Sequence, residues 1–266
     1  MKNIGLIAGS DRFPFLVAQE IRKSGDRTIC IALKEEADLR LNEVCDKIYW
    51  FSIGKFQKIL DTLKSENVKN VVMAGKVQHV RIYSAIKMDW RAIKVMGSLV
   101  NKKTDTILGA IANEFERDGI RLISPDVYLK HLFVEKGLLS GRKLSARENR
   151  DVGFGYKIAK GVAGLDIGQV VVVKDGSVIA VESVEGTDEC IKRAYKLGGE
   201  NAIVVKVAKP DQDFRFDLPV IGINTIYTLK ENRIRAMAVE SNAALILDKN
   251  EALDIAKKIG ITIISI

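Results

Sequence analysis

The sequence predicts an α/β protein of two domains, with a parallel sheet in the first and a mixed sheet containing a β-hairpin in the second. Short apolar runs alternate with amphipathic helical patterns over residues 1–130, which is typical of parallel strands covered by helices. Later in the chain, two strand-like runs are joined by Asp175-Gly176, a pair that favours a tight type I′ turn. At 266 residues the chain is long enough to form two cores of ordinary size.

The first domain is predicted over residues 1–130 from strands and helices in alternation. Its first strand leads into a helix that begins near Pro14 and ends at Gly25, because proline is tolerated in the first helical turn and glycine commonly follows the last. The helix at 55–66 carries apolar residues on one face, namely Phe56, Ile59, Leu60 and Leu63. The expected strands are 2–8, 28–33, 47–51, 70–74 and 120–124, with a further helix at 104–117. This alternation predicts a Rossmann-like domain.

A polar, basic and glycine-bearing segment over residues 131–150 is interpreted as the connection between the domains. The second domain is predicted over residues 151–266. A helix at 149–163 leads into the hairpin strands 169–174 and 177–184. The later elements are expected to be a helix after Gly186, a helix at 225–232, strand-like runs at 237–240 and 244–247, a helix at 250–259 and a strand at 262–266. A hairpin combined with βα units predicts a mixed α/β domain.

The composition excludes several classes of protein. With 47% hydrophobic and 29% charged residues, the chain is predicted to be globular. It has no apolar run long enough to span a membrane, and the first apolar run is interrupted at residues 9–12, so we expect neither an anchor nor a signal peptide and a cytoplasmic location. Three cysteines far apart in sequence do not indicate a disulfide framework. With two histidines, any metal should be a hard cation bound by oxygen.

The formal net charge of +8 favours an anionic partner. A phosphorylated small molecule and an anionic membrane surface both fit this charge. Nucleic acid is not expected, because the basic residues are dispersed along the chain and aromatic residues make up only 6%.

Glycines at two strand ends of the first domain are candidate ligand-binding positions. Gly9-Ser10 follows the first strand, and Gly75-Lys76 follows the strand at 70–74. Ligands bind beyond the carboxyl ends of parallel strands, where glycine lets backbone N–H groups approach a phosphate. A plain strand-to-helix turn explains Gly9 equally well, since the segment lacks the G-x-G-x-x-G pattern and Glu36 and Asp38 are poorly placed for a ribose. His79, close behind Gly75, is more typical of a surface histidine than of a catalyst.

Carboxylates gather around the hairpin of the second domain. Glu182, Glu185 and Asp188 lie near the end of the second hairpin strand, and each is either a metal ligand or a solvated side chain. Thr187 either caps the following helix or contacts a phosphate there. Gln169, at the start of the hairpin, is a candidate for a hydrogen bond to substrate.

The charged run at residues 209–217 lies between apolar strands and begins with Lys209. Oxygen ligands beside cations on loops are what a Mg²⁺-phosphate site requires. Asp217 stands between Phe216 and Leu218, so its carboxylate requires a nearby cation, metal or donor. Pairing with Arg215 or Lys209 is the structural alternative to a functional role.

Several motifs together resemble the LpxI-type UDP-2,3-diacylglucosamine pyrophosphatases. They are GLIAGS..FP at 5–14, DIGQ at 166–169, AVE at 180–182 with EGTD at 185–188, KP.QD at 209–213 and DLP.IG at 217–222. Their order and separation extend over essentially the whole chain. The resemblance implies Mg²⁺-dependent hydrolysis of the pyrophosphate bond of UDP-2,3-diacylglucosamine to 2,3-diacylglucosamine 1-phosphate (lipid X) and UMP, a step in lipid A biosynthesis.

The resemblance also implies roles for individual residues. The essential aspartate of the family lies in the D-L-P motif, so Asp217 is the expected catalytic residue and a Mg²⁺ ligand. From their position near the hairpin, Glu182 and Asp188 are the further Mg²⁺ ligands that we expect. The expected substrate contacts are Gly9, Ser10, Gly75, Gln169, Thr187 and Lys209. Because the substrate carries acyl chains, we expect peripheral association with the cytoplasmic face of the inner membrane. The sequence leaves the oligomeric state open, including a homodimer. A non-catalytic or regulatory protein that binds sugar nucleotides is the alternative function.

Overall fold

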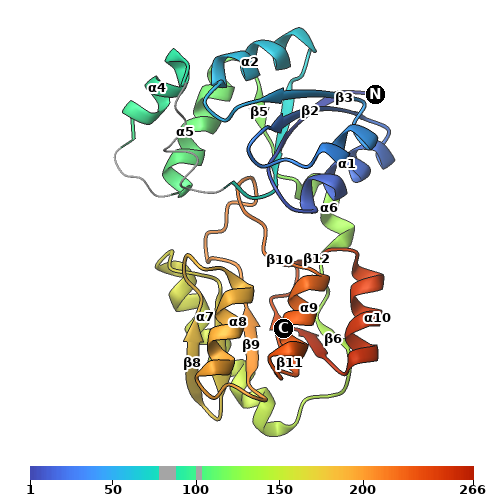
Figure 1. Cartoon of the computed structure of the whole chain (residues 1–266), viewed down its shortest axis with the longest axis vertical. Coiled ribbons are helices and arrows are strands. Elements are labelled where there is room, and N and C mark those ends of the chain that lie inside the picture. Colours follow the sequence, from blue (N-terminus) through green and yellow to red (C-terminus); the bar gives the residue numbers. More distant parts are fainter. Residues whose placement is uncertain (78–87, 100–103) are drawn as a thin grey trace. The chain divides into compact units, whose positions relative to one another are not determined.

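The computed structural model describes residues 1–77, 88–99 and 104–266, and they divide into two compact units (Figure 1). The N-terminal unit comprises Met1–Lys130 together with Asp213–Phe216, and the C-terminal unit comprises His131–Gln212 and Asp217–Ile266. Each unit has its own hydrophobic core. His79 lies outside the described residues.

The N-terminal unit is built on a five-stranded sheet in the order β3-β2-β1-β4-β5, in which every pair of neighbours is parallel. Its strands are β1 (Asn3–Ala8), β2 (Arg27–Leu33), β3 (Lys47–Phe51), β4 (Asn70–Ala74) and β5 (Arg121–Leu122). Its helices are α1 (Phe13–Lys23), α2 (Phe56–Ser65), α4 (Trp90–Gly97), α5 (Thr104–Arg117) and α6 (Asp126–Leu129). The strand order reverses between β1 and β4, so the carboxyl ends of these two strands lie where open α/β sheets bind ligands.

The core of the N-terminal unit confirms the helical pattern predicted at 55–66. All four apolar residues of that face of α2, from Phe56 to Leu63, are buried. They pack with Ile29, Ile31 and Val71 of the sheet, and Phe56 and Phe115 meet edge to face with ring centroids 5.3 Å apart. The strand predicted at 120–124 is shorter than expected, since only Arg121–Leu122 pair with β4.

The C-terminal unit is built on a six-stranded mixed sheet in the order β6-β13-β11-β9-β7-β8. Its strands are β6 (Gly137–Ser140), β7 (Val170–Lys174), β8 (Ser177–Val181), β9 (Ile203–Lys206), β11 (Ala236–Val239) and β13 (Thr262–Ser265). A separate parallel pair joins β10 (Val220–Ile221) and β12 (Leu245–Ile246). The helices are α7 (Ala146–Gly164), α8 (Thr187–Lys196), α9 (Ile223–Glu231) and α10 (Lys249–Ile259).

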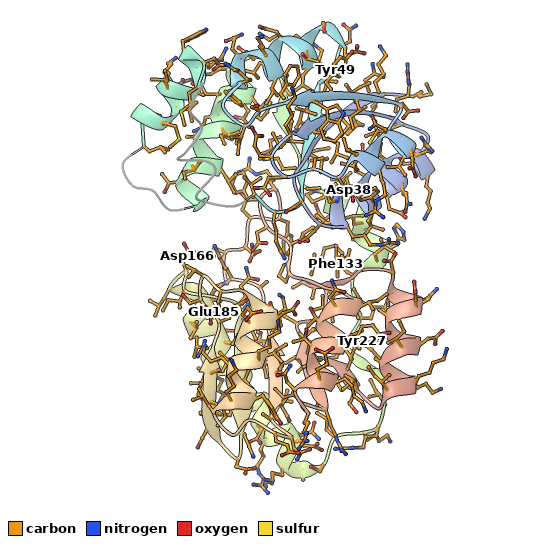
Figure 2. All side chains as sticks on the ribbon, viewed as in Figure 1. Asp38, Tyr49, Phe133, Asp166, Glu185 and Tyr227 are labelled. Atoms are coloured by element: carbon orange, nitrogen blue, oxygen red, sulfur yellow. The ribbon has the colours of Figure 1, made fainter. Side chains whose placement is uncertain are left out.

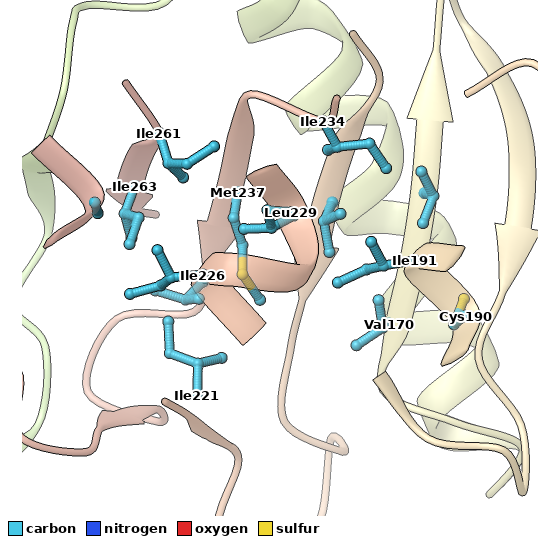
Figure 3. Packing of buried hydrophobic residues seen from close by; sticks show 14 of the residues in the cluster. Val170, Cys190, Ile191, Ile221, Ile226, Leu229, Ile234, Met237, Ile261 and Ile263 are labelled. Atoms are coloured by element: carbon cyan, nitrogen blue, oxygen red, sulfur yellow. The ribbon is translucent and has the colours of Figure 1, made fainter. Parts of the chain in front are cut away.

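Helices cover both faces of this sheet because its strands alternate their side chains between two cores. Val171 and Val173 pack with residues of α7. Val170 and Val172 pack with α8, α9 and α10 in the cluster that includes Ile191, Ile226 and Met237 (Figure 3). A strand that is buried on both faces reads as a continuous apolar run, as the four valines of β7 do.

The hairpin forms as predicted. Asp175 and Gly176 both have positive φ, at 54° and 74°, as a type I′ turn requires. The buried carboxylate of Asp151 on α7 accepts hydrogen bonds from the backbone N–H groups of Asp175 (3.0 Å) and Gly176 (2.8 Å). β8 ends at Val181, three residues earlier than the strand predicted at 177–184.

The segment at 131–150, predicted to connect the two domains, contributes a strand and the start of a helix to the C-terminal unit. β6 pairs antiparallel with β13 and covers an edge of the sheet. α7 begins at Ala146, three residues before the predicted start at 149, because Ser145 and Glu148 form a reciprocal capping box. The polar residues of this segment therefore cap a helix as well as face solvent.

Candidate functional site

The ends of the hairpin strands bring Gln169 and Glu182 together. Gln169 immediately precedes β7 and Glu182 immediately follows β8, so both lie at the end of the hairpin opposite its turn. Asp166 and Glu185 flank them at the same end of the unit (Figure 2). A Cβ atom added to Gly168 would lie 2.1 Å from the carbonyl oxygen of Glu182. Only glycine lets the two strand ends approach this closely.

The carboxylate of Glu182 is buried and accepts two hydrogen bonds. Its Oε2 accepts from the backbone N–H of Gln169 (2.9 Å), and its Oε1 accepts from the hydroxyl of Thr187 (2.8 Å). The Thr187 hydroxyl in turn accepts a hydrogen bond from Nζ of Lys206 (2.9 Å), which is also buried, at the end of β9. A buried carboxylate and a buried ammonium are thus bridged by one hydroxyl.

Asp217 is exposed and is held by a neutral amide. Its Oδ2 accepts a hydrogen bond from Nε2 of Gln169 (2.5 Å), and its backbone carbonyl accepts from Nε2 of Gln212 (2.9 Å). Within the described residues, neither Arg215 nor Lys209 forms an ion pair with Asp217. Arg215 pairs with Asp213 (2.7 Å), and Lys209 pairs with Asp166 (2.5 Å).

Thr187 does not cap α8. Gly186 is the N-cap residue, with φ of 84°, and Thr187 is the first helical residue. Its hydroxyl is therefore available to Glu182 and Lys206. Asp188 occupies the first turn, where a carboxylate interacts favourably with the helix dipole. Within the part of the chain that the structure describes, Oδ1 of Asp188 and Oε1 of Gln169 are buried without a hydrogen-bond partner.

Glu185 forms an ion pair with Arg193. Its carboxylate accepts hydrogen bonds from Arg193 and from the backbone N–H of Ser183 (3.1 Å). The hydrogen bond from Arg193 holds the pKa of Glu185 below its ordinary value. This pair anchors the end of β8 to α8.

The three carboxylates predicted to bind Mg²⁺ do not assemble into one cluster. Among residues 1–77, 88–99 and 104–266, no group of three or more histidine, cysteine, aspartate or glutamate side chains is arranged to hold a metal ion. Both oxygens of Glu182 are occupied by protein donors. Asp217 fits Mg²⁺ by itself, because this ion is commonly bound through one or two carboxylates together with substrate phosphates and water.

The two glycine loops of the N-terminal unit meet. The backbone N–H and the hydroxyl of Ser10 both donate to the carbonyl of Lys76 (2.9 Å each). A Cβ on Gly9 would lie 2.4 Å from the Lys76 carbonyl oxygen, and one on Gly75, at φ of 90°, would lie 2.4 Å from that of Ser10. The glycines therefore permit this close contact between loops. Substrate contact by Gly9, Ser10 and Gly75 stays a prediction.

A hollow of about 420 Å³ opens beside the first of these loops. Its lining includes Asp11, which follows β1, Phe15 of α1, and Glu36 and Asp38, which follow β2. The sequence spacing predicts that Glu36 and Asp38 are poorly placed to contact a ribose, a prediction that stays untested, and the structure places both at this hollow. Asp38 (labelled in Figure 2) is paired with Arg40, whose hydrogen bonds lower the pKa of the Asp38 carboxyl.

Lys206 was missed by the sequence reasoning. It stands at the end of an apolar run, Ile203 to Lys206, that is buried throughout. The available signal was the lysine itself, since an ammonium in a buried strand requires polar partners.

The fold and the site define a two-domain α/β protein with a polar network at the base of a hairpin. Two family models match it, the LpxI N-terminal domain over residues 3–132 and the LpxI C-terminal domain over residues 135–264. The chain belongs to the LpxI family.

A curated relative matches over the full length. UDP-2,3-diacylglucosamine pyrophosphatase LpxI of Caulobacter vibrioides is 28% identical over 277 residues, covering 100% of this chain and 98% of the relative.

Two solved structures that match the chain are distant likenesses. The biotin carboxylase domain of Hydrogenobacter thermophilus 2-oxoglutarate carboxylase shares 14% identity at a TM-score of 0.29, covering 73% of this chain and 41% of that one. Phosphoribosylglycinamide synthetase from Anaerococcus prevotii shares 14% identity at 0.26, covering 69% and 39%. Neither likeness bears on function.

Proposed function

We propose that this protein hydrolyses the pyrophosphate bond of UDP-2,3-diacylglucosamine, releasing 2,3-diacylglucosamine 1-phosphate and UMP in lipid A biosynthesis. The observation that carries the proposal is the match of both LpxI domains in their order along the chain, together with a relative of that activity aligned from end to end. The Rossmann-like character proposed for the N-terminal domain is supported by the parallel strand order β3-β2-β1-β4-β5.

Asp217 is the proposed catalytic carboxylate. One of its oxygens is fixed by Gln169, and among the described residues the other has no hydrogen-bond partner. An exposed carboxylate held on one side can accept a proton from water or orient it toward phosphorus. Lys209 is proposed to supply a cation for phosphate oxygens, and Gln169, which donates to Asp217, is proposed as a further substrate contact. Thr187 is not retained as a phosphate donor, because its single hydroxyl hydrogen is directed to Glu182. Gly9, Ser10 and Gly75 are proposed as substrate contacts in the N-terminal unit.

Mg²⁺ is the proposed cofactor, with Asp217 as its protein ligand. The bound ion would neutralise charge on the pyrophosphate oxygens. Glu182 is better accounted for by its two protein donors, and Asp188 stays a candidate ligand because one of its oxygens is without a partner among the described residues.

Peripheral association with the cytoplasmic face of the inner membrane is proposed from the substrate and the charge. No helix in the described part of the chain combines the length and apolar character needed to cross a bilayer. The net charge of +8 attracts the chain to anionic lipid, where the acyl chains of the substrate reside.

Purified protein incubated with UDP-2,3-diacylglucosamine tests the proposal. We expect UMP and the diacylated sugar phosphate in equal amounts with Mg²⁺, and none after addition of EDTA. Binding of the substrate without release of UMP at any metal concentration would instead establish the alternative, a non-catalytic nucleotide-binding protein.

A further inference from the structure

A hydrogen-bond network of Lys206, Thr187, Glu182 and Gln169 leads to Asp217, and the donor and acceptor of each of its hydrogen bonds can be assigned. Lys206 can only donate, so the Thr187 hydroxyl accepts from it and must direct its single hydrogen to Glu182. Glu182 accepts from Thr187 with one oxygen and from the Gln169 N–H with the other. The Thr187 hydroxyl and the Gln169 N–H are thereby both directed to Glu182, which carries the negative charge.

The arrangement is costly for a purely structural purpose. Glu182 and Lys206 are 8% exposed each, yet within the described residues they form no direct ion pair with each other or with another side chain. Removing two charges from water is expensive, and apolar residues of similar volume often stabilise such a position better. Two buried charges separated by a hydroxyl therefore point to a role beyond holding the fold.

The hydrogen bonds of this network fix the backbone of Gln169. Glu182 accepts its backbone N–H, and its backbone carbonyl accepts from the N–H of Val207, the residue after Lys206 (3.0 Å). With its backbone held on both sides, the side chain of Gln169 donates to Oδ2 of Asp217. The orientation of Asp217 is thus linked to Glu182 through a single intervening residue.

We infer that Glu182 and Lys206 are positioning residues, which act through Thr187 and Gln169 to orient the carboxylate of Asp217. This inference rests on the proposed function only for its kinetic readout. It replaces the metal-ligand role predicted for Glu182, because both oxygens of that carboxylate serve the chain of hydrogen bonds.

Glu182→Gln is the principal test. The amide would present an NH₂ group toward either the Gln169 N–H or the Thr187 hydroxyl, so one acceptor position is lost while the volume is kept. We expect kcat to fall by about tenfold to a hundredfold with little change in KM, which is the scale of a small misplacement at a reacting group. Lys174→Met is the control, because Lys174 lies at the other end of β7 and its ammonium bonds only the Gly198 carbonyl (2.9 Å) among the described residues.

Combining the substitution with Asp217→Asn separates positioning from stability. If Glu182 acts through Asp217, Glu182→Gln should cost far less kcat in the Asp217→Asn background than in the wild type, because the two residues act as a unit. Losses that multiply independently in the double variant would overturn the inference.

The side-chain amide signal of Gln169 in a ¹H–¹⁵N spectrum provides a readout that does not need turnover. Assigned by its loss in Gln169→Met, it should move in Glu182→Gln, in Lys206→Met and in Asp217→Asn, and stay in place in Lys174→Met. An unmoved signal in folded Glu182→Gln or Lys206→Met would overturn the inference. Wild-type protein that releases no UMP would refute the proposed function alone, since this spectrum still decides the positioning role.

Discussion

At Asp217 a neutral amide, not a cation, holds the carboxylate. A cation at this position would neutralise the negative charge that metal binding or proton abstraction needs, whereas the Gln169 amide fixes direction and leaves the charge in place. The nearby cations are engaged elsewhere, Arg215 by Asp213 and Lys209 by Asp166. Because these cations pair with other carboxylates, the negative charge of Asp217 is not neutralised by them.

Asp217→Asn should abolish most turnover without unfolding the protein. The substitution keeps the shape and removes the charge, so we expect kcat to fall by roughly two to four orders of magnitude, the scale of general-base and electrostatic contributions. Release of UMP and thermal unfolding of the same preparation are the measurements. Turnover within twofold of wild type would remove Asp217 from the mechanism.

The sequence predicts a role for Asp217 through the family resemblance of its D-L-P motif, but it does not predict which residues contact this carboxylate. Gln169 is predicted only as a hydrogen-bonding residue at the start of the hairpin. Their contact joins residues 48 positions apart, and no local pattern encodes such a distance. Lys206 was not predicted because its strand reads as an ordinary apolar run. Its hydrogen-bond acceptor, the hydroxyl of Thr187, lies on another element.

Among the elements, the hairpin carries most of the candidate site, and its geometry depends on Gly168. The close approach of Gly168 to the Glu182 carbonyl sets the separation of the strand ends, and hence the distance over which Glu182 reaches the Gln169 N–H. The Asp175-Gly176 pair between two strand-like runs predicted the hairpin, and a period-3.6 pattern predicted α2, because both signals lie within a short stretch of sequence. The start of α7 and the strand β6 were missed because a cap and an edge pairing depend on only a few residues each.

Gly168→Ala should damage both stability and activity. The added methyl group forces the strand ends apart, so we expect a loss of about 1–3 kcal/mol in the free energy of unfolding and a fall in kcat. Urea unfolding and UMP release measure the two effects. Gly161→Ala is the matched control, because a Cβ in α7 meets no atom within 4 Å, and it should stabilise the protein by about 0.5–1 kcal/mol.

The cap of α7 should make stability depend on pH at the acidic end. The hydrogen bond from Arg142 lowers the pKa of Glu148 to about 2. A carboxyl with a lowered folded-state pKa stabilises the fold fully above its unfolded value of about 4.3, and that contribution is lost as the pH falls toward 2. Glu148→Gln should therefore be less stable than wild type by about 1 kcal/mol at neutral pH.

Urea unfolding of wild type and Glu148→Gln across the range from about pH 7 to pH 2 measures this contribution. The difference between the two proteins should shrink below about pH 4. A difference that is constant over the whole range would show that the charge of Glu148 contributes nothing to the cap.

At the scale of the whole molecule, the net charge is the property from which we predict association with a membrane surface. A surplus of eight positive charges gives a long-range attraction to anionic surfaces that no single patch has to supply. Screening by salt weakens such attraction, whereas burial of apolar surface in lipid is largely independent of salt.

Liposome flotation should therefore show association with anionic vesicles at low salt and release at high salt. Each basic residue near an anionic surface contributes about 1 kcal/mol, so a few suffice for measurable binding. Neutral vesicles are the control and should retain little protein. Retention that does not change with salt would point to apolar insertion in place of charge attraction.

The short segment Asp213–Phe216 groups with the N-terminal unit, and Phe216 packs against the core of that unit, although the chain around the segment belongs to the other unit. A gene cut between Lys130 and His131 would therefore not yield two self-sufficient fragments. The first fragment would lack an aromatic side chain from its core, and the second would carry an orphaned loop ending at Asp217. Insertions, truncations and recombination between relatives are accordingly constrained at two places along the sequence, one of them directly beside the candidate catalytic carboxylate.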